Sequence, residues 1–169
     1  GGSLLNLNSI WADRNGQGLI IEHSSHHRHF ELAKEGILAI ANHHQFIREL
    51  TGSPTPDELP SIAGSYCRLG RMWHLLRESK GEITLALIKQ FMADHKLEKE
   101  HVNDYNYIEP IDDGTICVHY WHLKQYLREG NFKRAIETYL MGKTVGSIII
   151  EPKSLTIHTC SGNPCNHSY

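Results

Sequence analysis

Thirteen histidines in a chain of 169 residues are the first side chains whose chemistry needs an explanation. Five of them would converge on a metal ion if neighbouring strands brought them together: His26, His27, His29, His43 and His44. Zinc sites need three or four ligands at a fixed geometry, commonly as H-E-x-x-H on one helix, and that pattern does not occur in this sequence. We therefore expect solvated histidines, with no metal and no cofactor. A histidine-bound metal enzyme is kept as an alternative hypothesis.

The four cysteines, at positions 67, 117, 160 and 165, follow no familiar spacing. No two of them form the C-x-x-C pair of a zinc ribbon or redox loop, and they are too few for a small secreted disulfide scaffold. This usage favours a reducing compartment, so we expect a cytoplasmic protein. Cys160 and Cys165 are close enough in sequence to form a disulfide under oxidising conditions, and the spacing alone leaves that open.

Two further sets of polar residues could form a site. Arg68 and Arg71 are three residues apart, so in a helix they share one flank with Ser65. Asn42 directly follows an apolar run that we interpret as a strand. Taken alone, the two arginines are typical of a solvated helix edge, and the asparagine is typical of a turn.

Composition places these residues in one domain covering 1–169. A hydrophobic fraction of 40 % is enough for a core, and 17 Lys and Arg against 19 Asp and Glu give a net charge of −2. No basic stripe is present, so nucleic acid is not an expected partner. No apolar stretch approaches the roughly 20 residues that span a bilayer, so we expect no membrane segment. The composition leaves a homo-oligomer open.

Strands are predicted at both ends of the chain. The apolar runs that define three antiparallel strands within 3–41 are 5–12, 18–22 and 36–41. Asn15-Gly16 between the first two is a strong hairpin signal. A terminal hairpin over 145–160 turns at residues 152–154.

Helices are predicted between these strands. Within 61–95, apolar residues recur at three- and four-residue intervals from Tyr66, and a second helix begins at Thr84. After polar loops at 45–60 and 96–113, the region 115–141 combines a short strand at 115–120 with two helical segments broken at Gly130. Strands at both ends with helices between them indicate the α+β class.

Six short motifs in order along the chain resemble the C-terminal part of an N-terminal-nucleophile (Ntn) hydrolase. After Gly1-Gly2 they are Gly18-Leu19-Ile20-Ile21-Glu22-His23-Ser24, Ala41-Asn42-His43, Ser65-Tyr66-Cys67-Arg68-Leu69-Gly70-Arg71-Met72, Asp94-His95, Thr115-Ile116-Cys117-Val118-His119, and Gly146–Pro152 with Gly162-Asn163-Pro164-Cys165. The nearest group is the acyl-coenzyme A:6-aminopenicillanic acid acyltransferase-like amidohydrolases, within the wider group of choloylglycine hydrolases and penicillin V acylase. The resemblance implies the later half of an αββα sandwich of mostly antiparallel sheets with covering helices.

The resemblance also implies a chemistry, the hydrolysis or acyl transfer of a linear, non-peptide amide C–N bond in a small-molecule substrate. In the family, an N-terminal cysteine freed by autoprocessing attacks the carbonyl, and its own α-amino group takes the proton. Asn42 matches the family's oxyanion-hole asparagine and Arg68 its active-site arginine, which lowers the pKa of the thiol. Ser65, Arg71 and His43 match supporting positions. No cofactor is implied.

One departure from the family limits what this chain can do alone. Its first residue is Gly1, and no cysteine precedes Cys67, so the nucleophile must come from a preceding segment or a second chain. The element Ala41-Asn42-His43 also has alanine where the family usually has threonine. The alternative is a non-catalytic binding or assembly module that retains half of the fold.

Overall fold

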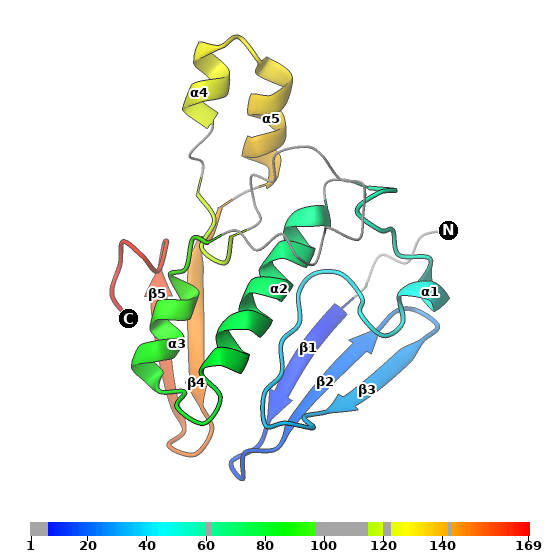
Figure 1. The fold of residues 1–169 in the computed structure, drawn as a ribbon, viewed down its shortest axis with the longest axis vertical. Coiled ribbons are helices and arrows are strands. Elements are labelled where there is room, and N and C mark those ends of the chain that lie inside the picture. The colour runs from blue at the N-terminus through cyan, green and yellow to red at the C-terminus, as the bar shows by residue number, and fades with distance from the viewer. Residues whose placement is uncertain (1–6, 60–61, 97–114, 120–122, 142) are drawn as a thin grey trace.

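The computed structural model describes residues 7–59, 62–96, 115–119, 123–141 and 143–169. Helices and antiparallel strands are both present, so the predicted α+β class is confirmed (Figure 1). The elements in chain order are β1 (Leu7–Ala12), β2 (Gly18–His23), β3 (Arg28–Leu32), α1 (Arg48–Thr51), α2 (Ala63–Glu78), α3 (Leu85–Met92), α4 (Leu123–Arg128), α5 (Phe132–Met141), β4 (Gly146–Glu151) and β5 (Thr156–Ser161).

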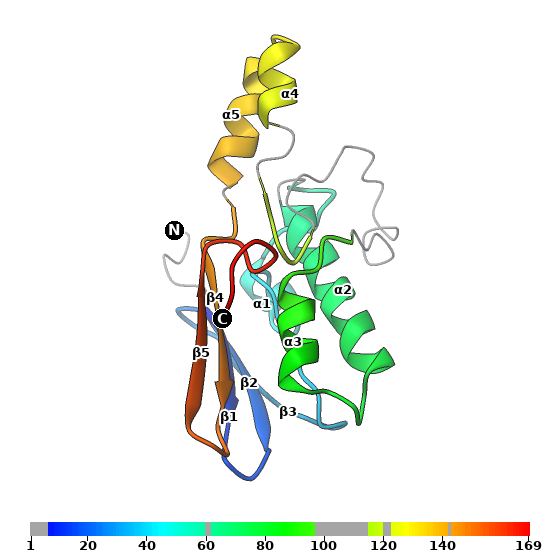
Figure 2. The ribbon, with the colours of Figure 1, turned by 90° about the vertical axis from the view of Figure 1, so that its left-hand side faces the viewer.

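The strands form two antiparallel sheets, one in the order β1-β2-β3 and one that pairs β4 with β5. The expected turn at Asn15-Gly16 joins β1 to β2, with Gly16 at a φ of 86°. The predicted terminal hairpin is also present, within one or two residues of its expected bounds. Helices α2 and α3 lie on one side of both sheets, as Figure 2 shows.

The prediction of a third strand at 36–41 is wrong. The third strand is β3, which pairs with β2 from Leu19 opposite Leu32 to His23 opposite Arg28. The run 36–41 is apolar for another reason, because Ile37, Ala39 and Ala41 pack against α2 and α3 in the hydrophobic core. An apolar run of this length does not by itself distinguish a strand from another kind of buried segment.

The prediction of a strand at 115–120 is also wrong for its described residues, 115–119. Their backbone groups bond to loops and not to a neighbouring strand. The Cys117 N–H donates to the Asp94 carbonyl at 3.0 Å. The Val118 N–H donates to Thr144 Oγ1 at 2.9 Å, and the Thr144 N–H donates back to the Val118 carbonyl at 3.1 Å. Most of the expected loop at 96–113 lies outside the described residues.

The helix predictions are confirmed. The apolar face of α2 contributes Leu69 and Leu76 to a core that also contains Phe91 of α3. Thr84 caps α3, since its Oγ1 accepts the N–H of Leu87 at 3.2 Å. Gly130, at a φ of 71°, separates α4 from α5 as expected. The single turn α1 lies within the predicted loop at 45–60, and no helix in the described ranges could cross a membrane.

Candidate functional site

Ser65, in the first turn of α2, joins the helix to the segment that carries Asn42. Its Oγ accepts the backbone N–H of Asn42 at 2.9 Å and that of His43 at 3.3 Å, and lies 2.8 Å from Nδ1 of His43. A hydroxyl group has two lone pairs and one proton. With both lone pairs engaged by N–H groups, the Ser65 proton donates to Nδ1, which leaves the His43 proton on Nε2.

This geometry also decides against a Ser65–His43 nucleophilic pair. Ser65 is 4 % exposed, and the lone pairs that would attack a carbonyl already accept hydrogen bonds. A nucleophile needs a free lone pair within reach of substrate. Ser65 therefore holds the segment of residues 42–43 against α2 and is not placed to act as a nucleophile.

Two other polar side chains hold the same segment from the sheet side. Nδ2 of Asn8, on β1, donates to the carbonyls of Ala41 and His43 at 2.8 and 2.9 Å, one on each side of Asn42. The buried carboxylate of Glu22, on β2, accepts three consecutive backbone N–H groups, from residues 45, 46 and 47, at 2.7, 2.9 and 3.2 Å. The backbone around Asn42 is thus held from both sheet and helix.

His43 lies in a low-dielectric and electropositive environment. Its ring stacks on the Tyr66 ring at 3.7 Å between centroids, and it is 9 % exposed. Burial and, next, the positive charge of Arg68 lower the pKa of His43 to about 4. His43 is therefore neutral at neutral pH, and the field of the Arg68 guanidinium reaches the segment that carries Asn42.

Four of the five sequence-predicted site residues are therefore brought together. Asn42 is exposed and follows the core segment, while Arg68 is half-buried on α2, one helical turn after Ser65. His43 lies between these elements and bonds to Ser65. Asn42 and Arg68 come from segments far apart in sequence, and the bond from the Asn42 N–H to Ser65 places Asn42 near the first turn of α2, the helix that carries Arg68.

Arg71 lies elsewhere. It is 7 % exposed and forms a bidentate ion pair with Asp94, with Nε to Oδ1 at 3.0 Å and an η-nitrogen to Oδ2 at 2.8 Å. Burial acts to raise the pKa of the Asp94 carboxyl, but the hydrogen bond and charge of Arg71 outweigh it, so this pKa lies below its ordinary value. Arg71 therefore connects α2 to the segment after α3.

A second cluster lies beside this ion pair and was missed from the sequence. One donor atom from each of His95, Cys117, His119 and Cys165 lies within 4.8 Å of the other three. Two signals could have suggested it: the C-x-H spacing of Cys117 and His119, and the presence of four ligand residues in the motifs quoted above. The spacings to His95 and Cys165 are too long to be recognised without the fold.

The histidines considered from sequence make other contacts. His29 bonds to Glu31 at 3.2 Å and stacks on Phe46, and Nδ1 of His44 lies 3.2 Å from both Thr51 Oγ1 and Ser53 Oγ. His26 and His27 lie at the turn between β2 and β3. Within the described ranges, none of these residues belongs to a group of potential metal ligands. The four cysteines, all in those ranges, are free thiols.

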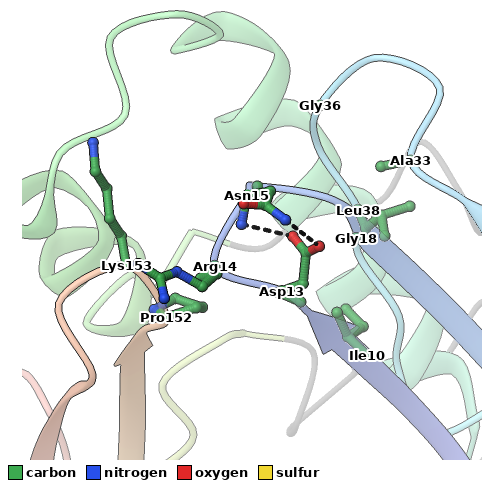
Figure 3. Close-up of a pocket in the computed structure, with 12 residues that line it drawn as sticks. Ile10, Asp13, Arg14, Asn15, Gly18, Ala33, Gly36, Leu38, Pro152 and Lys153 are labelled. Carbon is green, nitrogen blue, oxygen red and sulfur yellow. Dashed lines mark hydrogen bonds between the residues drawn. The ribbon is translucent and has the colours of Figure 1, made fainter.

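A pocket of about 640 Å³ opens near the β1–β2 turn and the tip of the β4–β5 hairpin (Figure 3). Asp13 points its carboxylate back into its own turn, where it accepts the N–H groups of Asn15 and Gln17, both at 2.9 Å. None of the five sequence-predicted site residues lines this pocket. It therefore plays no part in the chemistry considered below.

Compared with known proteins, the chain matches no family model, and no curated protein and no solved structure matches it. The family resemblance therefore depends on the motifs quoted above.

Proposed function

We propose that this chain is the later portion of a cysteine-type Ntn amidohydrolase or acyltransferase. In this proposal its strands and helices are half of an αββα sandwich, and it supplies Asn42 and Arg68 to a nucleophile from a preceding segment or a second chain. The observation that supports the proposal is that Ser65, one helical turn before Arg68, accepts the backbone N–H of Asn42, and that the charge of Arg68 acts on the adjacent His43.

The proposed role of Asn42 is to stabilise negative charge. When a thiolate attacks an amide carbonyl, the developing oxyanion is best stabilised by donors that are already fixed in place. Asn8, Ser65 and Glu22 hold the backbone on both sides of Asn42, and its side chain is exposed to a substrate. Its Nδ2 is then the donor to the oxyanion.

The proposed role of Arg68 is electrostatic. A fixed guanidinium favours a thiolate over a thiol, and lowers the pKa of the attacking cysteine. The same charge already lowers the pKa of His43. The neutral His43 adds no positive charge of its own, so Arg68 is the cation assigned to the nucleophile.

The uncovered apolar face of the β1-β2-β3 sheet supports the proposal that this chain is half of an αββα sandwich. The strand register puts Trp11, Leu19 and Leu32 side by side, with Phe30 and Leu7 on the same face. Trp11 is 62 % and Leu32 is 64 % exposed, whereas Ile20 and Glu22 on the opposite face are buried. Apolar faces of this kind mark interaction surfaces. A second sheet packed on this face would complete the αββα arrangement.

The proposal is tested on the complete gene product, with the segment encoded before Gly1. We expect a cysteine there and hydrolysis of acyl amides. Asn42→Ala should lower kcat about 10²–10³-fold, as removal of one oxyanion donor does. Asn15→Ala, at an exposed turn, is the matched control. A coding sequence with only a start codon before Gly1 would contradict this form of the proposal.

The second candidate is a non-catalytic binding or assembly module that retains half of the fold. The uncovered apolar face of β1-β2-β3 favours it equally, because a partner chain could cover the same surface. The two candidates differ in the effect of the site residues. If Asn42→Ala and Arg68→Ala leave acyl-amide hydrolysis by the complete product at the level of the exposed control variants Asn15→Ala and Arg128→Ala, the catalytic proposal is wrong.

A further inference from the structure

We propose that His95, Cys117, His119 and Cys165 bind one structural zinc ion. The proposal is independent of the proposed function, since it uses none of the residues assigned to amide chemistry. It follows from the arrangement of four donor atoms that belong to three separate segments of the chain.

Two of the distances among the donor atoms match those of a tetrahedral zinc site, and two more are shorter. Zn–S bonds of about 2.3 Å and Zn–N bonds of about 2.05 Å, at tetrahedral angles, place two sulfurs ~3.8 Å, a sulfur and a nitrogen ~3.6 Å, and two nitrogens ~3.3 Å apart. Sγ of Cys117 and Sγ of Cys165 are 3.7 Å apart, and Sγ of Cys117 and Nε2 of His119 are 3.6 Å apart. Nε2 of His119 lies 3.1 Å from both Nε2 of His95 and Sγ of Cys165, ~0.2 Å and ~0.5 Å shorter than the tetrahedral values, and all four donor atoms lie within 4.8 Å of one another.

The types of donor fit the same ion. Two sulfurs and two imidazole nitrogens in a tetrahedron are typical of zinc sites of the Cys₂His₂ kind. Both cysteines bind as thiolates, so binding releases their two protons to solvent, and the two negative charges neutralise Zn²⁺. Because all four positions are filled by protein, no position is left for water or substrate, which is the mark of a structural site.

Neighbouring groups hold the ligands in position. The Asp94 carbonyl accepts the Cys117 N–H at 3.0 Å, so the residue before one ligand fixes the backbone of another. Nδ2 of the buried Asn163 lies 3.7 Å from Sγ of Cys117 and donates to the Val118 carbonyl at 2.8 Å. Such bonds to ligands are the usual second layer of a metal site.

The ion would act as a cross-link. His95 follows α3, and His119 lies 24 residues after it, close to Cys117. Cys165 follows β5 and lies 48 residues after Cys117. Cross-links between distant residues reduce the conformational freedom of the unfolded chain. The zinc would thereby hold the segment 115–119 and the C-terminal segment against the end of α3.

The first test measures metal in the purified wild-type chain, expressed with zinc in the medium. We expect one zinc per chain by elemental analysis. Replacement by Co²⁺ should give the absorption of a tetrahedral ion, with charge-transfer bands from thiolate ligands. Stoichiometric iron, a chain without bound metal, or a disulfide between Cys117 and Cys165 would overturn the proposal.

The second test uses variants, followed by far-UV circular dichroism. Cys165 is exposed, so Cys165→Ser should fold while it loses stoichiometric zinc and about half of the thiolate-to-cobalt absorption. Cys160→Ser is the matched control, since Cys160 lies outside the cluster and bonds to the His167 carbonyl. If Cys165→Ser binds zinc and cobalt as Cys160→Ser does, the proposal is wrong.

Discussion

Arg71 and Asp94 form a bidentate ion pair that joins the two candidate sites of this protein. Arg71 lies on α2, the helix that has Ser65 in its first turn and carries Arg68, and Asp94 precedes His95 of the Cys/His cluster. The pair thus fixes α2 relative to the segment after α3. A change in either residue is expected to affect both regions.

Arg71→Met should destabilise the chain by about 3 kcal/mol. It leaves the carboxylate of Asp94 partly buried without its guanidinium partner, and breaking such a pair from one side is costly. Urea unfolding of the variant and wild type measures the difference. The double variant Arg71→Met with Asp94→Leu should recover part of the loss, because no uncompensated charge remains. No loss in the single variant would show that the pair contributes little.

Glu22→Gln should destabilise the chain by about 2 kcal/mol with almost no change in shape. The carboxylate accepts three backbone N–H groups in a buried position, and glutamine replaces one acceptor oxygen with an NH₂ group that faces N–H donors. Chemical unfolding measures the loss. Glu49→Gln, at an exposed position on α1, is the control and should stay within about 0.5 kcal/mol of wild type.

His43 should make the stability depend on pH in the mildly acidic range. Its folded-state pKa of about 4 lies below the ordinary 6.5, so the unfolded chain binds the proton first as the pH falls. This contribution is complete above about pH 6.5 and is lost toward pH 4, by up to about 3 kcal/mol.

The measurement is the free energy of unfolding between pH 7 and pH 4 for wild type and His43→Gln. Other groups titrate in this range, so the difference between the two curves isolates His43. We expect the wild type to lose more stability than the variant over this interval. Parallel curves would mean that His43 titrates normally in the folded state.

Asn163→Ala should weaken zinc binding about 10–100-fold, the usual effect of losing a group that supports a metal ligand. Its Nδ2 contacts Sγ of Cys117 and fixes the Val118 carbonyl. Competition with a chromophoric chelator measures the affinity, and Asn166→Ala at an exposed position is the control. Equal affinities in the two variants would remove Asn163 from the metal site.

The local sequence was sufficient for elements with a strong period or a strong signal. The apolar spacing from Tyr66 identified α2, Thr84 identified the start of α3, and Asn15-Gly16 identified the first hairpin. These features depend on residues within one or two turns of each other. The strand β3 was missed because its polar residues obscured the two-residue alternation that is typical of a strand. The apolar run 36–41 was wrongly predicted to be a strand because a segment buried against helices has no such alternation.

The sequence by itself thus determined the α+β class, the helices and hairpins, and the residue types available for chemistry. Only the tertiary structure decided which of those residues meet. Asn42 and Ser65 are brought together across 23 residues, and Cys117 and Cys165 across 48. The physical reason is that such contacts are fixed by how α2, α3 and the strands pack, and by buried bonds such as those of Glu22. No short-range pattern in the sequence predicts that packing.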